Sequence, residues 1–523
     1  MSSILTNTSS MVALQTLKGI NSNLQKVQSE ISTGKSVNSA KDNAALWAIS
    51  KVMESDVAGF KAVSESLALG ESSVAVARNA SETVTDLLTD IKSKVIAAQE
   101  SNVDREKIQT DIGQLTDQIK AVTGAAQFNG LNLVQGTEDV DILASLDRNS
   151  AGGVDSNSIT VSRQDLTSIA GTRGVTAETA GGYAAITTYA GNAATGKTAT
   201  STAAGDASLS ATSKAATGDS LELVITQADS ATFEVTIGGQ TASYTSASTG
   251  DTAENIRDAL VSSLSALGVE GVTVSAGTAN DRIQIQNANE FDSVTVKMGN
   301  NVDFKAYNGT DKTTTTDADV VLEQRATSVD FSTTAAVNEG DSYTVTVDSQ
   351  EYVYIAGKDE SMKDVANGLK IAIDSAGVTG LTAEVQDNNG AARLAIDNEG
   401  GAVTVGLSVA SGGVASGGLF GLENIDVTTD DGAAAALDNI ETLVQSSIDA
   451  AAEFGSVAGR IETQTDFISN LTDSLKAGIG TLVDADMEEA SARLQALQVQ
   501  QQLGVQSLSI ANQAPQSLLS LFR

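Results

Sequence analysis

The sequence of 523 residues contains neither cysteine nor histidine. Without cysteine it can form no disulfide framework and offers no thiolate nucleophile. Without histidine it has no Ser-His-Asp or Cys-His pair and no histidine-ligated metal. These absences exclude most common catalytic arrangements. We therefore expect a protein that is not an enzyme, needs no cofactor and has no catalytic or metal-binding residues.

A site built only from carboxylates is the arrangement that this inventory leaves open. Acidic pairs such as Asp430-Asp431 offer the oxygen ligands that a hard cation prefers, but helix capping or a solvated turn explains them more simply. Aromatic residues make up only 3% of the chain, which argues against a cleft in which sugars stack. No acidic pair therefore stands out as a catalytic candidate.

Proline is almost absent as well, since Pro515 is the only one in the chain. Proline breaks helices because it lacks an amide N–H and fixes φ, so the first 514 residues can form very long helices. The chain contains no apolar stretch of about 20 residues that would span a membrane. Its N-terminus, MSSILTNTSS, lacks the basic and apolar regions of a conventional secretory signal. These features alone predict a cytoplasmic protein with no membrane insertion.

The net charge of −35 is concentrated in the middle of the chain. Residues 1–135 hold 12 Lys and Arg against 14 Asp and Glu, and residues 434–523 hold 4 against 11. Residues 136–433 hold 15 against 41. An acidic segment repels nucleic acid and anionic membranes, so we expect no nucleic-acid partner and a solvated outer position for the middle. The total charge alone would equally suit any soluble acidic protein.

Long apolar stripes flank this acidic middle. From Leu46 to Ala98, apolar or small residues recur at alternating steps of three and four for more than seven heptads, which is typical of a coiled-coil helix. At 1.5 Å per residue this helix would be roughly 80 Å long. A matching stripe runs from Leu437 to Leu482. The predicted seam of this helical layer includes Ile49, Met53, Phe60, Val63, Leu67, Ile91, Val444, Phe454, Ile461, Ile468 and Leu475.

These two stripes can pack together only if the middle of the chain loops out between them. We therefore predict an antiparallel hairpin of long helices with both termini at one end. An intracellular coiled-coil tether is the alternative that periodicity alone allows, but such tethers seldom carry a β-rich insertion.

Two shorter stripes lie at the extremities, one ending at Gly34 and one beginning after Asp484 and Asp486. A short isolated helix is marginal in water, so we predict that residues 1–35 and 490–523 become ordered only when neighbouring copies cover their apolar side chains. Polymerisation and folding would then be one event. The side chains assigned to this self-assembly are Leu17, Ile20, Leu24, Val27, Ile31, Leu494, Leu497 and Leu503.

The short link between the first two helical stripes carries helix-end signals. Gly34 has the place of a helix C-cap, and Ser39 with Asp42 has the spacing of a capping box. We interpret these residues as helix punctuation and not as a binding site.

The middle of the chain changes from heptads to alternation. LELVIT at 221–226 and TFEVTI at 232–237 are typical of strands, and an amphipathic helix follows at 251–268. The same order recurs around a helical segment at 361–377. We therefore predict two related α+β modules, at about 218–300 and 340–410, each with the order strand–strand–helix–strand–strand. The helices carry apolar faces made of Ile256, Leu260, Leu264 and Leu267 in the first module, and of Val365, Leu369 and Ile373 in the second.

The predicted fold class is multidomain α+β, with a long antiparallel coiled-coil core formed by both termini and inserted β-rich outer domains. The predicted order is an N-terminal inner-core helix and linker (1–43), the N-terminal half of the helical layer with a β-hairpin region (44–175), a variable outer region (176–428), the C-terminal helix of the helical layer (429–483) and a C-terminal inner-core helix (484–523). The stretch 170–217 is too biased in composition to be assigned any structure.

Both ends of the chain carry recognisable motifs. LQKVQSEISTGKSVNSAKDNAALWAIS (24–50) and GAAQFNGLNLV (124–134) resemble the N-terminal signatures of bacterial flagellins, and SLSIANQAPQSLLSLFR (507–523) resembles their ending, with residues 512–516 as a turn. The resemblance covers roughly residues 1–135 and 434–523. The two modules resemble, more weakly, a small module inserted in flagellins and hook-associated proteins.

This resemblance implies a structural subunit that self-polymerises into the extracellular flagellar filament for swimming motility. It implies export without a cleaved signal peptide, through the flagellum's own channel, which reverses the cytoplasmic prediction. The implied partners are other flagellin subunits, the export apparatus with a chaperone, and the hook-associated and cap proteins. The alternatives are a hook–filament junction protein, which shares the terminal architecture, and a secreted adhesin.

Overall fold

The computed structural model describes residues 7–148, 153–174, 176–177, 187–189, 198–200, 209–212, 219–226, 228–299, 304–308, 311–315, 320–331, 336–388, 390–399 and 404–521. The chain divides into two compact units. Unit 1 comprises Met1–Ser72, Val140–Val161 and Ser456–Arg523, and unit 2 comprises Ser73–Asp139 and Ser162–Gly455. Helices form both ends and a β-rich region lies between them in the sequence, as predicted. Most of the stretch 170–217 lies outside the described residues.

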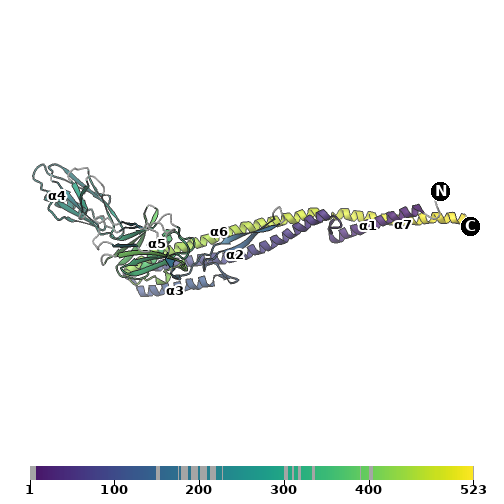
Figure 1. Cartoon of the computed structure of the whole chain (residues 1–523), viewed down its shortest axis with the longest axis horizontal. Coiled ribbons are helices and arrows are strands. Elements are labelled where there is room, and N and C mark those ends of the chain that lie inside the picture. Colours follow the sequence, from purple (N-terminus) through teal and green to yellow (C-terminus); the bar gives the residue numbers. More distant parts are fainter. Residues whose placement is uncertain are drawn as a thin grey trace. The chain divides into compact units, whose positions relative to one another are not determined.

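In unit 1, the terminal helices α1 (Thr8–Thr33) and α7 (Met487–Leu521) lie side by side and antiparallel, with both ends of the chain at the same end of the pair (Figure 1). Helix α1 ends at Gly34, whose φ of 70° is left-handed. Glycine adopts this conformation without a Cβ penalty, so the predicted C-cap is confirmed.

The predicted turn at residues 512–516 is wrong, because α7 continues through these residues to Leu521. Proline fixes φ near −65°, which is compatible with a helix, but inside one it loses a hydrogen bond and its ring crowds the carbonyl four residues earlier. A donor from another part of the chain can offset that loss.

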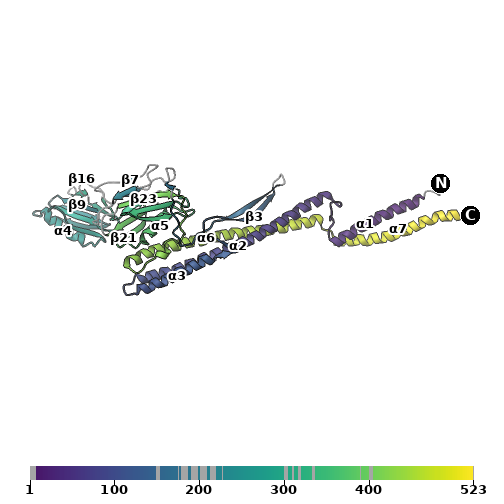
Figure 2. The ribbon, with the colours of Figure 1, turned by 60° about the horizontal axis from the view of Figure 1, so that its bottom comes forward.

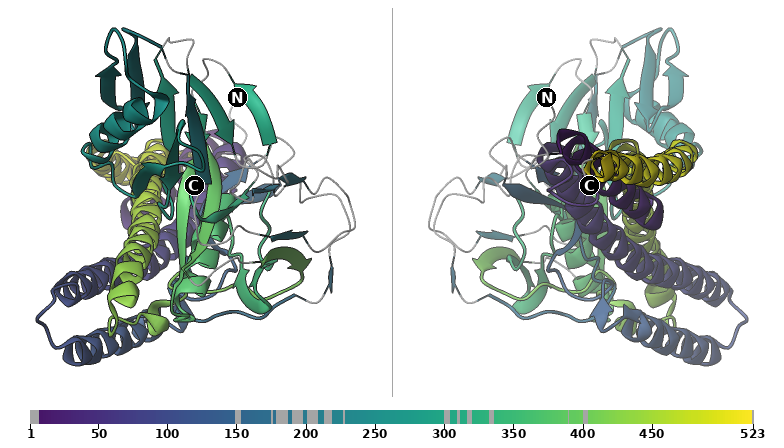
Figure 3. Two further views of the ribbon diagram at one scale, coloured as in Figure 1. Left: turned by 90° about the vertical axis from the view of Figure 1, so that its left-hand side faces the viewer. Right: turned by 90° about the vertical axis from the view of Figure 1, so that its right-hand side faces the viewer.

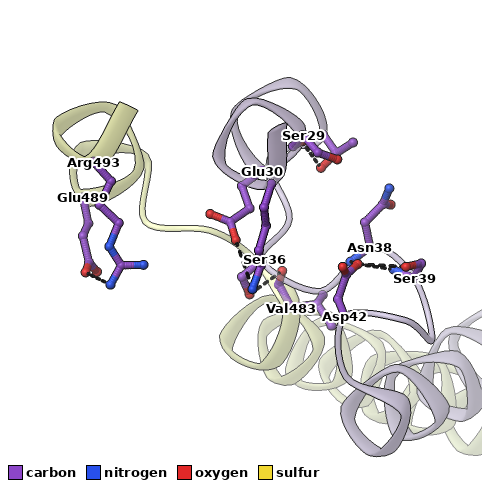
Figure 4. Close-up of polar contacts among 11 residues, drawn as sticks. Ser29, Glu30, Ser36, Asn38, Ser39, Asp42, Val483, Glu489 and Arg493 are labelled. Atoms are coloured by element: carbon purple, nitrogen blue, oxygen red, sulfur yellow. Dashed lines mark hydrogen bonds and ion pairs between the residues drawn. The ribbon is translucent and has the colours of Figure 1, made fainter. Parts of the chain in front are cut away.

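The link between α1 and α2 (Ala44–Ala98) is held to the end of α6 (Asp430–Val483) by backbone hydrogen bonds. Ser36 N donates to Val483 O at 2.7 Å, and Ala485 N donates to Gly34 O at 2.9 Å. Figure 4 shows the first of these contacts beside the Asp42 turn.

The prediction that Ser39 and Asp42 form a capping box at the start of the helix is wrong, because the two residues lie before the helix begins. The Asp42 carboxylate accepts from Ser39 N and Ser39 Oγ, both at 2.9 Å, and so closes a turn before the helix. The residue that caps α2 is Asn43, whose Oδ1 accepts from Leu46 N at 3.2 Å. The spacing of the motif was read correctly, but the helix begins at Ala44.

A β-hairpin packs against α2 within unit 1. It consists of β3 (Val140–Arg148) and β4 (Val154–Val161), and its label β3 lies beside α2 in Figure 2. The hairpin packs closely against Gly70 of α2, because a Cβ added there would lie only 2.4 Å from Ile142 Cδ1. Gln464 Nε2 of α6 donates to Ala144 O at 2.9 Å and holds the hairpin from the other helix.

In unit 2, α3 (Arg105–Ala125) is capped by Asp104, whose side chain accepts from Lys107 N. A small hairpin of β1 (Gln127–Phe128) and β2 (Leu131–Asn132) follows. Its turn is Asn129-Gly130, and both residues have positive φ, as a tight two-residue hairpin turn requires. A short 3₁₀ helix, Leu422–Asn424, packs against α3.

Unit 2 contains two modules of identical strand order. The first contains β9 (Asp219–Ile225), β10 (Thr232–Ile237), β11 (Gln240–Thr245), α4 (Ala253–Ser265), β12 (Val272–Ala276), β13 (Arg282–Asn287) and β14 (Val294–Met298). The second contains β18 (Thr327–Asp330), β19 (Ser342–Val347), β20 (Gln350–Ile355), α5 (Met362–Asp374), β21 (Leu381–Asn388), β22 (Ala391–Asn398) and β23 (Thr404–Ser411). The internal repeat inferred from the sequence is therefore present in the structure.

The sheets of the two modules correspond strand by strand. The first module pairs β12-β13-β9 and β11-β10-β14, and the second pairs β21-β22-β18 and β20-β19-β23. Figure 3 shows these teal and green strands from two further sides. Additional strands extend the sheets: β15 (Phe304–Asn308), β16 (Asp311–Thr315) and β17 (Val320–Leu322) in the first module, and β5 (Thr176–Ala177), β6 (Thr187–Tyr189), β7 (Thr198–Thr200) and β8 (Leu209–Thr212) in the second.

The predicted strand order of the modules was incomplete, because each has three strands before its helix and three after it. The start near Gly340 was also too late, since β18 already belongs to the second module. Strand β11, QTASYT, was missed because Ala242 and Tyr244 are its only apolar residues. The predicted helix faces are correct except at Leu267, which follows the end of α4 and is half-buried. The other members, Ile256, Leu260, Leu264, Val365, Leu369 and Ile373, are all buried in the module cores.

Candidate self-assembly surfaces

The residues predicted for self-assembly lie mostly between the two terminal helices of one chain. Val27 is buried and Leu503 is 59% exposed. Gly504 allows close contact here, because a Cβ added to it would lie 3.2 Å from Leu17 Cδ1. The remaining predicted residues, Leu17, Ile20, Leu24, Ile31, Leu494 and Leu497, are half-buried. Heptad spacing identified the apolar face but could not tell which helix covers it.

A second apolar surface on the same helices faces solvent, and Leu503 is the one member of it that the sequence analysis assigned to self-assembly. Apart from Val499 and Leu503, the side chains of this surface fall outside the predicted apolar stripes, so periodicity gave no signal for them. Their common property is a large apolar side chain on a helix whose covered face is elsewhere. They are Met11, Val12, Leu14, Val499, Leu503, Val505 and Ile510.

Part of this surface borders an open groove of about 720 Å³ between α1 and α7. Val12 and Leu503 contribute apolar side chains to its walls, and Gly504 leaves space in its floor. The full lining is Thr8, Ser9, Val12, Ala13, Thr16 and Ile20 of α1, and Gln500, Leu503, Gly504 and Ser507 of α7.

The terminal segments that carry this surface have no charged side chains. Residues 1–17 and 494–522 contain no Asp, Glu, Lys or Arg. Charges begin nearer the link, where Arg493 pairs with Glu489 at 2.7 Å (Figure 4). Removing a charge from water costs several kcal/mol, so a charge-free surface can be buried far more cheaply.

Most of the side chains predicted for the seam of the long helices are buried or half-buried, and one of the predictions is wrong. Ile49 is 51% exposed, and Ser50 is 3% exposed in its place. The stripe advances by four residues from Leu46 and not by three, and Ser50 Oγ donates to Trp47 O at 2.9 Å. Val63, Leu67, Ile91, Phe454, Ile461 and Ile468 are buried, and Met53, Phe60, Val444 and Leu475 are half-buried.

A polar cavity of about 260 Å³ lies within unit 2 and is lined by residues of the second module and of α6. Tyr354 and Glu360 line it, and Tyr354 OH donates to Glu360 Oε1 at 2.7 Å. Burial raises the pKa of Glu360 from its ordinary value of 4.5 to about 7. Burial also raises the pKa of Tyr354, so its hydroxyl remains a donor at neutral pH.

We expect Glu360→Gln to reduce the pH dependence of stability in the second module. Between pH 4.5 and about 7 the folded state keeps a proton on Glu360 that the unfolded state releases. The contribution of Glu360 to stability is therefore present below pH 4.5 and is lost as the pH rises to 7 and above. Urea unfolding of wild type and variant at pH 5 and pH 8 tests this. If the free energy of unfolding changed between pH 5 and pH 8 by the same amount in wild type and variant, the prediction would be wrong.

The structure gives two further findings about sites. Within the described part of the chain, no group of three or more acidic side chains is arranged to hold a metal ion. Among the described helices, none combines the length and apolarity needed to cross a bilayer.

Comparison with known proteins identifies relatives over the whole chain. Residues 4–139 match the bacterial flagellin N-terminal helical region, and residues 437–522 match the bacterial flagellin C-terminal helical region. Flagellin D of Rhizobium meliloti (strain 1021) is 31% identical over 529 residues, with 100% of both chains covered. Flagellin B of Rhizobium meliloti is 29% identical over 528 residues, also with 100% of both chains covered.

Among solved structures, flagellar hook associated protein-3 from Legionella pneumophila is 10% identical, with a TM-score of 0.32. The alignment covers 83% of this chain and 98% of that chain. A TM-score this low does not support the alternative of a hook–filament junction protein.

The paired terminal helices and their charge-free apolar surface are features of a structural protein that assembles with copies of itself. With a 31% identical relative over its full length, this chain belongs to the bacterial flagellin family. It is a subunit of the flagellar filament, as the terminal motifs predicted.

Proposed function

We propose that copies of the chain join through the outward apolar face of α1 and α7. The observation that supports this is the coincidence of two properties in the same short segments. The exposed apolar side chains, such as Val12 and Leu503, lie where charged residues are absent. In this proposal the groove between the helices receives apolar side chains of the next copy. Contacts that do not close on themselves generate an open helical filament.

The energetics favour coupled ordering and assembly. Burying a Leu, Ile, Val or Met side chain contributes about 1.5–3 kcal/mol. Ordering one residue of backbone costs about 1–2 kcal/mol, and the seam between α1 and α7 has only half-buried side chains at most levels. We propose that the seam residues Leu17, Ile20, Leu24, Val27, Ile31, Leu494 and Leu497 and the exposed residue Leu503 become fully covered only in the filament.

We further propose that the seam of α2 and α6 forms a helical layer around this inner core. In the proposal, Met53, Phe60, Val444 and Leu475, which are half-buried, complete their burial in the assembled layer. Fully buried members such as Phe454 serve the stability of the single chain. Ile49, which is exposed, would contact a neighbouring copy.

We also propose the route by which the chain reaches the filament. It leaves the cell unfolded through the flagellar export apparatus, accompanied by an export chaperone and without a cleaved signal peptide. The absence of cysteine supports this, because a threaded chain gains nothing from disulfides. Hook-associated and cap proteins would bound the polymer, and the chain would perform no catalysis.

Deleting residues 1–30 tests the proposed contact. We expect the truncated chain to form no filaments and to remain soluble, because it lacks most of α1. Sedimentation and electron microscopy measure assembly, and the near-UV circular dichroism of the buried Tyr343 and Tyr354 reports whether the second module remains folded. Intact filaments from the truncated chain would refute the proposal.

A further inference from the structure

The single proline of the chain lies inside α7, four residues after Ala511. In an α-helix each amide N–H donates to the carbonyl four residues earlier, and proline has no amide N–H. Pro515 therefore cannot supply the helical hydrogen bond to the Ala511 carbonyl. A backbone carbonyl without a donor is costly once water is excluded from it.

The side chain of Asn7 supplies a donor from the opposite end of the chain. Its Nδ2 donates to Ala511 O at 2.9 Å, and its Oδ1 accepts from Ser10 N at 3.1 Å. The second bond caps α1. One amide group therefore serves both terminal helices. Aspartate could cap α1 but has no N–H to donate, and serine has a single oxygen that cannot occupy both positions.

Two other pairs of side chains join α1 to α7 in the same antiparallel alignment. Ser10 Oγ donates to Asn512 Oδ1 at 2.9 Å, and Gln501 Nε2 donates to Asn21 Oδ1 at 2.7 Å. The apolar seam around them is weak, because Val27 is the one buried side chain of α1 in the described structure. A weak heptad seam tolerates a shift of the helices, and polar pairs within it select one alignment.

We propose that Asn7 is a positioning residue for self-assembly. By replacing the amide that Pro515 lacks, it sets the alignment of α1 on α7. The groove depends on that alignment, because its walls combine Thr8 and Val12 of α1 with Leu503 and Ser507 of α7. This inference rests on the proposed role of the groove in joining copies.

The proposal predicts that substitutions at positions 7 and 515 are not additive. In the full-length chain, Asn7→Ser keeps a helix cap but loses the long-range donor, so we expect the critical concentration for filament growth to rise about threefold to tenfold. Pro515→Ala restores a backbone N–H opposite Ala511. In that background Asn7→Ser is expected to change the critical concentration by less than about twofold.

A matched control and a second measurement complete the test. Asn23→Ser makes the same chemical change at an exposed position of α1 and should leave growth unaltered in both backgrounds. Because the chain has no cysteine, Ala13→Cys with Ser507→Cys can report the alignment. These two positions lie on opposite walls of the groove, Ala13 on α1 and Ser507 on α7. Asn7→Ser should lower the disulfide yield, and Pro515→Ala should restore it.

The outcomes separate the two proposals. An equal effect of Asn7→Ser in both backgrounds, or no effect on either growth or disulfide yield, would overturn the role of Asn7. Failure of the wild-type chain to polymerise would contradict the proposed function. In that case the disulfide yield in the soluble chain would still decide whether Asn7 sets the alignment.

Discussion

Replacing Leu503 by aspartate is expected to abolish filament growth at concentrations where the wild-type chain polymerises. Leu503 is 59% exposed in the single chain and borders the groove between α1 and α7. If a neighbouring copy covers it, the variant must bury an unpaired carboxylate in a surface that has no cation within residues 494–522. Burying such a charge costs several kcal/mol, so the critical concentration should rise about 100-fold or more.

Two further variants show whether the charge or its position is responsible. Asn255→Asp adds the same charge at an exposed position in the first turn of α4 and should leave growth unchanged. Leu503→Met keeps volume and apolarity and should also be tolerated. The critical concentration is measured by sedimentation of filaments from the supernatant. Normal growth of the Leu503→Asp variant would show that this face of α7 remains in solvent in the filament.

Replacing Asp374 by alanine is expected to destabilise the second module by about 3–5 kcal/mol, because it removes the buried carboxylate closest to the Lys370 ammonium and leaves only the exposed carboxylate of Asp438, at 3.9 Å, as an ionic partner. Lys370 Nζ lies 2.9 Å from Asp374 Oδ2, and both side chains are buried. Lys370 also donates to Asn439 Oδ1 of α6 at 2.9 Å and so links α5 to α6. The loss of stability is measured by urea unfolding followed through the buried tyrosines of this module.

The double variant Lys370→Met with Asp374→Leu should recover most of this loss. Replacing a whole buried ion pair by apolar side chains is often neutral, whereas removing one partner is not. The exposed ion pair of Lys476 with Asp473, at 3.2 Å, provides the control, and Asp473→Ala should cost less than about 1 kcal/mol. If Asp374→Ala costs no more than Asp473→Ala, the buried pair does not stabilise the second module.

Much of the architecture could be predicted because helix-forming signals are local. The heptad stripes, the scarcity of proline and the glycine at position 34 depend only on residues a few positions apart. They gave the long helices and the end of α1. The repeated helix faces, such as Ile256 with Leu260 and Val365 with Leu369, likewise indicated two related modules before any strand pairing was known.

Strands were harder, because a strand is stabilised by its neighbours more than by its own sequence. Strand β11 has few apolar residues and is held by its pairing with β10 and its contact with α4. Strand β18 has only four residues, yet all four are buried because β22 pairs with one of its edges and β6 with the other. No short-range pattern could have assigned β18 to the second module.

The absence of cysteine and histidine, the helical ends of this flagellin and the lack of charged side chains in residues 1–17 and 494–522 could all be read from its sequence. The tertiary structure decided which apolar faces are covered within one chain, as Ile49 and Leu503 show by their exposure. It also brought Asn7 to the carbonyl of Ala511, 504 residues away. The physical reason is that periodicity specifies a face of a helix, whereas burial depends on the distant segment that packs against it.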